Sequence, residues 1–359
     1  MRLGIIGLPG AGKTTIFNAL TRGNAPTGQS MGGRFEVLSA VVDVPDTRVD
    51  VLTEMFQPKK TTYAKVTYSD VAGIQKGASE KGGFSGAILN HLSGLDGFVH
   101  VVRAFASDLV PHPDGSVNAA RDLQALDTEF LFSDLVTVEG KLARLREGLG
   151  KGAFKGNKAE AQTELALFER LHEALLVERP LRELELSEEE EKSLRGYGFL
   201  TLKPVLVVVN IGDDQEEIPL DYPVAHSVVT HLRGKLEMEL SQLTGDDLEM
   251  FMAEYGVEEL SLGRVVALSY ELMGLQSFFT VGEDEVRAWT VNRGATAVEA
   301  AGTIHTDLAR GFIRAEVVAY EELVALGGMV GAKNAGKLRL EGKTYVVQDG
   351  DIVHIKFNI

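Results

Sequence analysis

Residues Gly7 to Thr14 read G-L-P-G-A-G-K-T, which fills every defined position of the phosphate-binding pattern G-x-x-x-x-G-K-[ST]. The glycines let backbone N–H groups turn toward phosphates, the lysine neutralises terminal phosphate charge, and the hydroxyl coordinates Mg²⁺. The apolar segment Arg2 to Ile6 precedes the loop, and Ile16, Phe17 and Leu20 follow at helical spacing. The sequence therefore predicts a strand, a phosphate loop and a helix, typical of a nucleoside triphosphatase.

A second motif, Asp70-Val71-Ala72-Gly73, follows the predicted strand Tyr63 to Tyr68. It has the D-x-x-G form, in which a strand-end aspartate reaches the Mg²⁺ shell and the glycine amide contacts the γ-phosphate. Thr14 and Asp70 are therefore the predicted metal ligands. The next residue is Ile74, where Ras-like enzymes carry the glutamine that positions the attacking water. Because a hydrocarbon side chain cannot hydrogen-bond to water, hydrolysis must be arranged differently.

Two side chains are candidates for positioning that water. Gln75 lies one place later, an offset that normally redirects the side chain, and His112 lies in the loop Leu109 to Asn118. Closure of this loop would bring His112 to the nucleotide, whereas a solvated loop histidine is the alternative interpretation. We predict Lys13 and His112 as the catalytic residues.

Base recognition is expected after the apolar strand Val205 to Val209, where the chain reads Asn210-Ile211-Gly212-Asp213. In the GTPase motif N-K-x-D the aspartate accepts hydrogen bonds from guanine. This chain keeps the asparagine and an acidic residue but has Ile211 in place of the lysine, so both ATP and GTP remain open as substrates. The predicted nucleotide-binding residues are Gly7, Leu8, Pro9, Gly10, Ala11, Gly12, Lys13, Thr14, Thr15, Gly73, Asn210, Gly212 and Asp213.

The pattern of strand-like and helical segments along the chain predicts three domains. Strands such as Phe35 to Val42 and Phe98 to Val102 indicate an α/β nucleotide-binding domain over residues 1–126 and 200–277. Between its halves, residues 127–199 are rich in Leu, Glu, Ala, Arg and Lys and predict an inserted two-helix arm. Short strands and turns, including Thr344 to Val347, then predict a compact α+β module over residues 278–359.

The predicted arm carries a basic cluster and an acidic run, Glu188 to Glu191. A solvated helix surface is one interpretation, and a partner-binding tip is the other. The basic cluster comprises Lys141, Arg144, Arg146, Lys151, Lys155 and Lys158.

Composition limits the partners and the compartment. No apolar run approaches the roughly 18 to 20 residues that span a bilayer, and the N-terminus enters a strand without a leader, so we expect a cytoplasmic protein with no membrane partner. The absence of cysteine excludes disulfides and cysteine-ligated zinc. The formal charge of −16 opposes nonspecific coating of nucleic acid, so no DNA partner is expected and any RNA contact must be local.

Together these residues resemble the YchF or Obg-like ATPases, a branch of the translation-factor-related P-loop proteins, over almost the whole chain. The resemblance rests on the phosphate loop, on Asp70 to Ile74 followed by K-G-A-S, and on H-V-V-R at residues 100–103. The closing segments are the most specific: EVRAWT from Glu285, GFIRAEV from Gly311, GAKNAGKLRLEGK from Gly331 and VQDGDIVHIKFN from Val347.

This resemblance implies a Ras-like nucleotide domain, an inserted helical arm and a C-terminal TGS domain, which is a ubiquitin-like β-grasp module. It also implies a hydrophobic residue at the glutamine position, as Ile74 shows, a preference for ATP, and the ribosome or its subunits as partner. Candidates for local RNA or ribosome contact in the C-terminal module, as an alternative to an ordinary solvated surface, are Arg310, Arg314, Lys333, Lys337, Arg339 and Lys343.

Three departures from the family pattern bear on function. Asp213 replaces the family's usual glutamate, and Gly10-Ala11 replace its usual asparagine and valine. The segment Pro26 to Phe35 lacks the usual threonine-containing switch sequence, for which Thr27 and Ser30 are weak substitutes.

A slow Mg²⁺-dependent ATPase that also uses GTP is the favoured function. A GTP-binding switch and a nucleotide-dependent binding module with negligible hydrolysis are the alternatives, the latter favoured by Ile74. A metabolic kinase is disfavoured because we find no acceptor pocket or catalytic base in the pattern.

Overall fold

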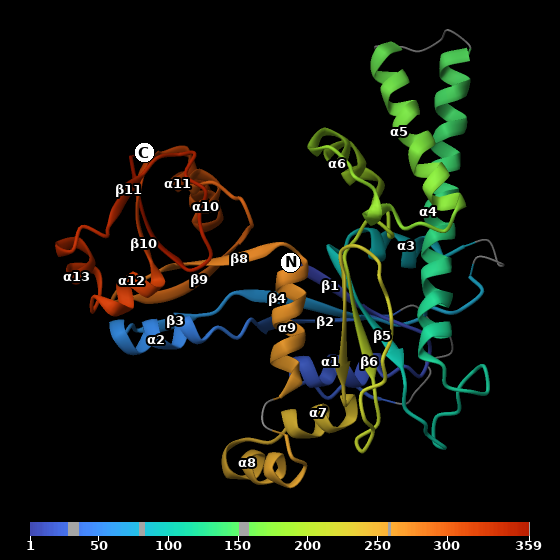
Figure 1. Ribbon diagram of the computed structural model, residues 1–359, viewed down its shortest axis with the longest axis horizontal. Helices are drawn as coiled ribbons and strands as arrows, with labels where there is room; N and C mark the ends of the chain where they lie inside the picture. The colour runs from blue at the N-terminus through green and yellow to red at the C-terminus, as the bar shows by residue number, and fades with distance from the viewer. Residues whose placement is uncertain (28–35, 79–82, 151–157, 258–259, 359) are drawn as a thin grey trace. The chain divides into compact units, whose positions relative to one another are not determined.

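The computed structural model describes residues 1–27, 36–78, 83–150, 158–257 and 260–358 (Figure 1). Most of the segment Pro26 to Phe35, including Ser30, and the basic residues Lys151 and Lys155 lie outside these ranges. The chain divides into two compact units, residues 1–40 with 67–262, and residues 41–66 with 263–359. This division groups residues 41–66 with the C-terminal part of the chain, whereas the sequence-based boundaries assigned them to the nucleotide-binding domain.

The first unit is built on a sheet whose strand order is β2-β4-β1-β5-β6-β7. The strands pair in parallel from β4 to β7, as expected for an α/β nucleotide-binding fold. The central strands β5 and β6 are fully buried, which explains their continuous apolar sequences. The bounds are β1 Arg2–Ile6, β2 Val37–Asp43, β4 Lys65–Val71, β5 Gly97–Arg103, β6 Val205–Asn210 and β7 Ser227–Leu232.

Helices complete this unit. One hydrophobic cluster joins Ile88 and Leu92 of α3 to Leu126 and Phe130 of α4 and to Val207 of β6, so α3 and the first turns of α4 cover one face of the sheet. Helix α3 spans Gly86–Ser93 and α4 spans Ala119–Gly150. The other helices of this unit are α1 Lys13–Thr21, α5 Lys158–Leu176, α6 Glu188–Leu194, α7 Gly234–Ser241 and α8 Gly245–Glu254.

The arm consists of the distal part of α4 and of α5 (Lys158–Leu176), which lie side by side (Figure 1). Val138, Leu142, Phe168 and Leu171 pack in one cluster between the two helices. Helix α4 begins at Ala119 rather than near Asp127, because the same apolar periodicity runs back into the core of the nucleotide-binding unit. A single continuous helix therefore joins the nucleotide domain to the arm.

The second unit holds a mixed sheet of order β11-β10-β12-β8-β9-β3. Strands β8 and β9 form an antiparallel hairpin, β10 pairs antiparallel with β12, and β12 runs parallel to β8. Helix α10 packs Ala297, Ala300 and Ala301 on this sheet, which gives the β-grasp arrangement that the resemblance implied. The bounds are β3 Lys60–Thr62, β8 Leu275–Thr280, β9 Glu285–Asn292, β10 Phe312–Ala319, β11 Arg339–Glu341, β12 Asp351–Phe357 and α10 Ala297–Ile304.

Shorter helices and one irregular segment complete the description. Thr344 to Val347, predicted among the short strands and turns of this module, contains a turn and an isolated bridge between Val346 and Thr296. None of the described helices is both long and apolar enough to cross a membrane. The remaining helices are α2 Thr47–Phe56, α9 Ser261–Leu272, α11 Thr306–Arg310, α12 Tyr320–Ala325 and α13 Met329–Asn334.

Candidate nucleotide-binding site

The phosphate loop turns sharply between β1 and α1, and two of its glycines are required sterically. Gly7 has φ 147° and Gly12 has φ 94°, values that strain any other residue. A Cβ atom on Gly7 would lie 2.3 Å from the carbonyl oxygen of Val101, and one on Gly12 would lie 2.2 Å from Nδ2 of Asn210. The close approach of β5 and β6 to the loop therefore explains why these positions hold glycine.

Lys13 curls back over the loop that it follows. Its Nζ donates hydrogen bonds to the carbonyl oxygens of Gly7 at 3.0 Å and Leu8 at 3.1 Å. Burial lowers the pKa of the Lys13 ammonium, and the nearby Asp70 carboxylate opposes that shift. A phosphate group at the loop would supply the negative charge that this buried cation lacks.

Thr14 and Asp70 meet where α1 begins and β4 ends. Thr14 Oγ1 donates a 2.6 Å hydrogen bond to Asp70 Oδ2. The other oxygen, Oδ1, is buried without a hydrogen-bond partner among the described residues, and burial raises the pKa of this carboxyl. Mg²⁺ binds in NTPases through one or two protein oxygens, substrate phosphates and water. The hydroxyl and the unpartnered carboxylate oxygen therefore fit a Mg²⁺ ion.

A cavity of about 830 Å³ opens beside these groups. Ten of the predicted nucleotide-binding residues line it: Pro9, Gly10, Gly12, Lys13, Thr14, Thr15, Gly73, Asn210, Gly212 and Asp213. Gly7, Leu8 and Ala11 do not line it and instead contact Lys13 or Asn210 through their carbonyl groups. The volume suits a drug-sized ligand.

Asn210 connects three segments around the cavity. Its Nδ2 donates to the carbonyl oxygen of Ala11 at 2.9 Å, and its Oδ1 accepts from the amide of Gly234 at 3.0 Å. Both ends of the amide are therefore used to hold the phosphate loop and the start of α7. Asn210 therefore fixes the shape of the site, and its amide is not left free to bind a base.

Asp213 is an acidic residue that lines the cavity and follows β6. Its Oδ1 is buried without a hydrogen-bond partner among the described residues, while Oδ2 lies 3.6 Å from Nζ of Lys235. Since a carboxylate only accepts hydrogen bonds, this oxygen can receive an N–H from a purine. Ile211 packs in the sheet core and also lines the cavity, where its apolar side chain lacks the charge of the GTPase lysine.

Several lining residues are absent from the sequence-based site. Besides the motif neighbours Ile74, Gln75 and Ile211, they are Pro26, Thr27, Glu36, Leu38, Ala72, Phe105, Ala106, Ser107, Leu109, Val110, Lys235 and Met238. Most of them lie in loops or after strands, where no motif distinguishes them. Phe105 had one available signal, since it follows the buried strand β5 at the edge where parallel strands place ligands.

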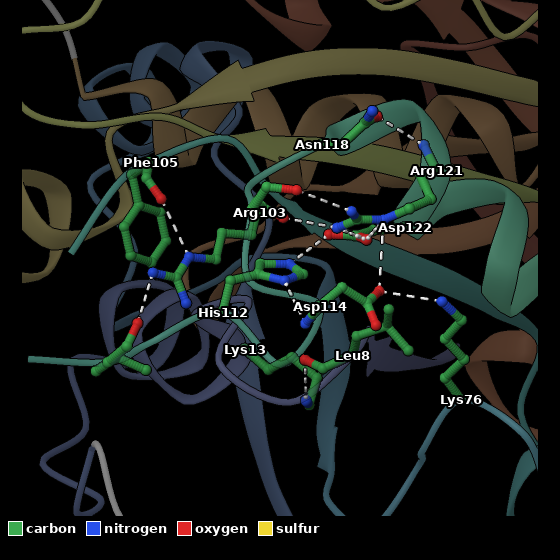
Figure 2. Close-up of polar contacts among 12 residues, drawn as sticks. Leu8, Lys13, Lys76, Arg103, Phe105, His112, Asp114, Asn118, Arg121 and Asp122 are labelled. Carbon is green, nitrogen blue, oxygen red and sulfur yellow. Dashed lines mark hydrogen bonds and ion pairs between the residues drawn. The ribbon is translucent and has the colours of Figure 1, made fainter. Parts of the chain in front are cut away.

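Of the two candidates for positioning water, Gln75 lines the cavity and His112 does not. Gln75 and its neighbour Ile74 both line the cavity, Gln75 with an exposed side chain and Ile74 with a buried one. His112 is not among the lining residues. Its Nε2 lies 2.7 Å from Oδ2 of Asp122, and its Nδ1 accepts a hydrogen bond from the amide of Asp114 at 3.1 Å (Figure 2). In this conformation both ring nitrogens are occupied.

Comparison with known proteins relates this site to characterised sequences. Residues 275–358 match the family model YchF-GTPase_C, described as "Protein of unknown function (DUF933)", and residues 2–133 match MMR_HSR1, described as "50S ribosome-binding GTPase". The Ribosome-binding ATPase YchF of Bacillus subtilis (strain 168) is 40% identical over 366 residues, which cover 99% of each chain. The protein of the same name from Escherichia coli O157:H7 is 39% identical over 365 residues, covering 100% of this chain and 99% of the relative.

A solved structure agrees with the sequence relatives. The Schizosaccharomyces pombe YchF GTPase superposes with a TM-score of 0.83 at 29% identity, covering 99% of this chain and 97% of the other. Both the nucleotide-binding fold and the C-terminal domain are thus shared over nearly the full length. The chain belongs to the YchF family.

Proposed function

We propose that the protein is a Mg²⁺-dependent nucleoside triphosphatase that binds and slowly hydrolyses ATP, also accepts GTP, and associates with ribosomes in the cytoplasm. One observation carries the nucleotide part: the unpartnered, buried Oδ1 of Asp70 beside Thr14 and Lys13 at the mouth of a glycine loop. Relatives that match the whole chain are named ribosome-binding ATPases, which supports ATP and the ribosome for this chain.

The phosphate loop supplies most of the binding energy in this proposal. Its amides and the N-terminus of α1 receive the β- and γ-phosphates, and Lys13 exchanges its two carbonyl contacts for phosphate oxygens. The Thr14 hydroxyl and Asp70 would hold Mg²⁺, which when bound neutralises charge that develops on the phosphates. Gly73 lines the same cavity, and its amide would contact the γ-phosphate.

Water positioning is the slow part of the mechanism. Ile74 cannot orient water, and the structure holds His112 against Asp122 rather than in the cavity. We infer that His112 positions the attacking water after its loop moves, since Leu109 and Val110 of the same loop already line the cavity. Turnover without a partner is then well below about 1 s⁻¹, as in unactivated GTPases.

Two other functions fit the same site less well. A GTP-binding switch is favoured by the unpartnered Oδ1 of Asp213, which matches the donors of guanine. A binding module with negligible hydrolysis is favoured by the resting position of His112. Both predict nucleotide binding, so the preference between ATP and GTP separates the switch from the proposed function, and a hydrolysis measurement separates the binding module.

The proposed partner contact uses the arm, with the C-terminal TGS-type domain as a second RNA-contacting candidate. On the described part of the arm, Arg144, Arg146 and Lys158 are exposed, although Arg146 is paired with Glu169 at 3.0 Å, whereas Lys141 is partly buried and paired with Glu164 at 2.7 Å. Exposed cations on a protruding helix pair suit ribosomal RNA better than a paired lysine does. Cosedimentation of an Arg144→Glu/Lys158→Glu variant with ribosomes tests this contact.

The deciding experiment follows release of phosphate from ATP and GTP with Mg²⁺, for the wild type and His112→Ala. The proposed function predicts slow ATP hydrolysis that falls at least about tenfold in His112→Ala, with nucleotide affinity unchanged because His112 lies outside the cavity lining. Hydrolysis of GTP in preference to ATP would support the switch. Binding without hydrolysis would support the binding module.

A further inference from the structure

The first turns of α4 hold the loop that carries His112. Asp122, in the first turn, accepts the hydrogen bond from His112 through Oδ2 and two hydrogen bonds from Arg121, Nε at 2.9 Å and Nη2 at 2.8 Å, through Oδ1. The His112 and Asp122 side chains are only 6% and 4% exposed, so water does not compete for this contact. Figure 2 shows the imidazole pointing toward the carboxylate.

The hydrogen-bond pattern fixes the state of the imidazole. A backbone amide can only donate, so the bond from the Asp114 amide leaves Nδ1 without a proton. The proton is therefore on Nε2, where it is donated to Asp122. A general base needs a free nitrogen directed at water, and this arrangement leaves none. The contact thus holds His112 in an inactive position instead of activating it.

The same helix also holds the segment that follows the D-x-x-G motif. Asp114 accepts a hydrogen bond from Lys76 Nζ at 3.0 Å and lies 3.4 Å from Nε of Arg121. About two turns further along α4, Glu129 accepts a 2.7 Å hydrogen bond from the amide of Gly77. The histidine loop and the motif segment are therefore fastened to one helix, which continues into the arm.

We propose that Asp122 is a positioning residue that latches His112 in a resting state, and that displacement of the first turns of α4 releases His112 toward the nucleotide. The inference rests on the proposed function, because it takes His112 as the group that orients water. It adds a route for control: since α4 is a single 32-residue helix from the nucleotide domain into the arm, a partner that moves the arm acts on the latch.

Asp122→Asn tests the latch with a minimal change of shape. An amide has one acceptor and one donor end, whereas Arg121 and the Nε2–H of His112 are both donors. If the amide oxygen of the variant accepts from Arg121, the NH₂ group faces the Nε2–H of His112, and two donors cannot form a hydrogen bond. If the oxygen accepts from His112, the NH₂ group faces the donors of Arg121 instead. Moving the proton to Nδ1 does not help, because it would then oppose the Asp114 amide. Every arrangement loses a hydrogen bond.

The experiment measures ATP turnover and nucleotide affinity of the full-length protein without ribosomes. The latch predicts that Asp122→Asn raises turnover at least about fivefold, because loss of the contact increases the population of released His112. Affinity for ATP stays within about twofold, since Asp122 does not line the cavity. Glu139→Gln, an exposed change of the same charge on the same helix, leaves turnover unchanged. The double variant Asp122→Asn/His112→Ala shows no gain.

Unchanged or reduced turnover in a folded Asp122→Asn protein overturns the latch, and a reduction would mean that Asp122 orients His112 productively. Absence of turnover in the wild type and in Asp122→Asn would instead contradict the proposed function itself. Side-chain ¹⁵N shifts of His112 give a readout independent of activity. The latch predicts a fixed Nε2–H tautomer in the wild type and a mixed, mobile imidazole in Asp122→Asn; a fixed tautomer in both would contradict it.

Discussion

Thr14 Oγ1 donates a 2.6 Å hydrogen bond to Asp70 Oδ2, although the two residues are 56 positions apart in the chain. This bond joins the phosphate loop to the D-x-x-G motif before any ligand is present. It leaves Asp70 Oδ1 buried and unpartnered among the described residues, an uncompensated acceptor that a divalent cation would satisfy. Stability and function therefore make opposite demands on this carboxylate.

Asp70→Asn separates those demands. Burial raises the pKa of Asp70, so the ionised carboxylate costs stability in the ligand-free protein at neutral pH, and the cost shrinks as pH falls. The amide can still accept the Thr14 hydrogen bond. We expect thermal unfolding of the ligand-free variant at an equal or higher temperature, and a loss of at least about tenfold in Mg²⁺-dependent ATP affinity. Unchanged Mg²⁺ dependence would remove Asp70 from the metal site.

Gly12→Ala tests the steric requirement of the phosphate loop. The new Cβ would lie 2.2 Å from Nδ2 of Asn210, at a φ of 94° that alanine avoids. The loop or β6 must shift, so ATP affinity should fall at least about a hundredfold and stability by more than about 1 kcal/mol. Gly140→Ala is the control, because its Cβ meets nothing and a helix interior should gain about 0.5–1 kcal/mol. Calorimetric titration and urea unfolding measure both quantities.

Asp213→Asn tests how the base is selected. The buried Oδ1 accepts only, and guanine presents two adjacent N–H donors where adenine presents one amino group. GTP affinity should therefore fall at least about tenfold, while ATP affinity changes less than about threefold. Competition binding with both nucleotides measures the ratio. Equal losses for both would mean that Asp213 shapes the site without reading the base.

Asp134 should make stability depend on pH. Its carboxylate accepts hydrogen bonds from the amides of Leu200 and Thr201 and from Thr201 Oγ1, yet burial raises its pKa to about 6. A raised pKa means that the folded protein holds the proton longer, so the contribution is present below about pH 4 and is lost as pH rises through about 6.

The comparison of wild type with Asp134→Asn isolates that contribution. The variant should be less stable throughout, because one amide oxygen cannot serve three donors. The deficit in the free energy of unfolding should be larger near pH 5 than near pH 7.5, by about 1 kcal/mol. Urea unfolding at the two pH values measures it, and a deficit independent of pH would show that Asp134 titrates normally.

Local patterns were sufficient for the core of the site. The strand predicted at Arg2 to Ile6 is β1 with the same bounds, and α1 begins at Lys13 as the motif requires. The apolar run at Val205 to Val209 falls within β6, which delivers Asn210 to the loop. These features depend on residues within a few positions of one another, which a single sequence displays.

Long-range pairings could not be predicted in the same way. Strand β3 contains only Lys60–Thr62 and pairs with β9 in the second unit, more than 200 residues away, so no local signal assigns it there. The contact of His112 with Asp122 spans a loop whose path is set by Arg103, which donates to the carbonyl oxygens of Phe105 and Val110. The sequence shows a histidine in a loop, whereas only the folded chain shows what holds it.

The dissociation constants of fluorescent ATP and GTP analogues, measured with and without Mg²⁺ for the wild type and Lys13→Ala, test the central claim most directly. We predict Mg²⁺-dependent binding of ATP at least about tenfold tighter than GTP, and a loss of at least about tenfold in Lys13→Ala, because the variant lacks the buried cation that faces the phosphates. Failure of the folded wild type to bind either nucleotide, or equal binding by Lys13→Ala, would contradict it.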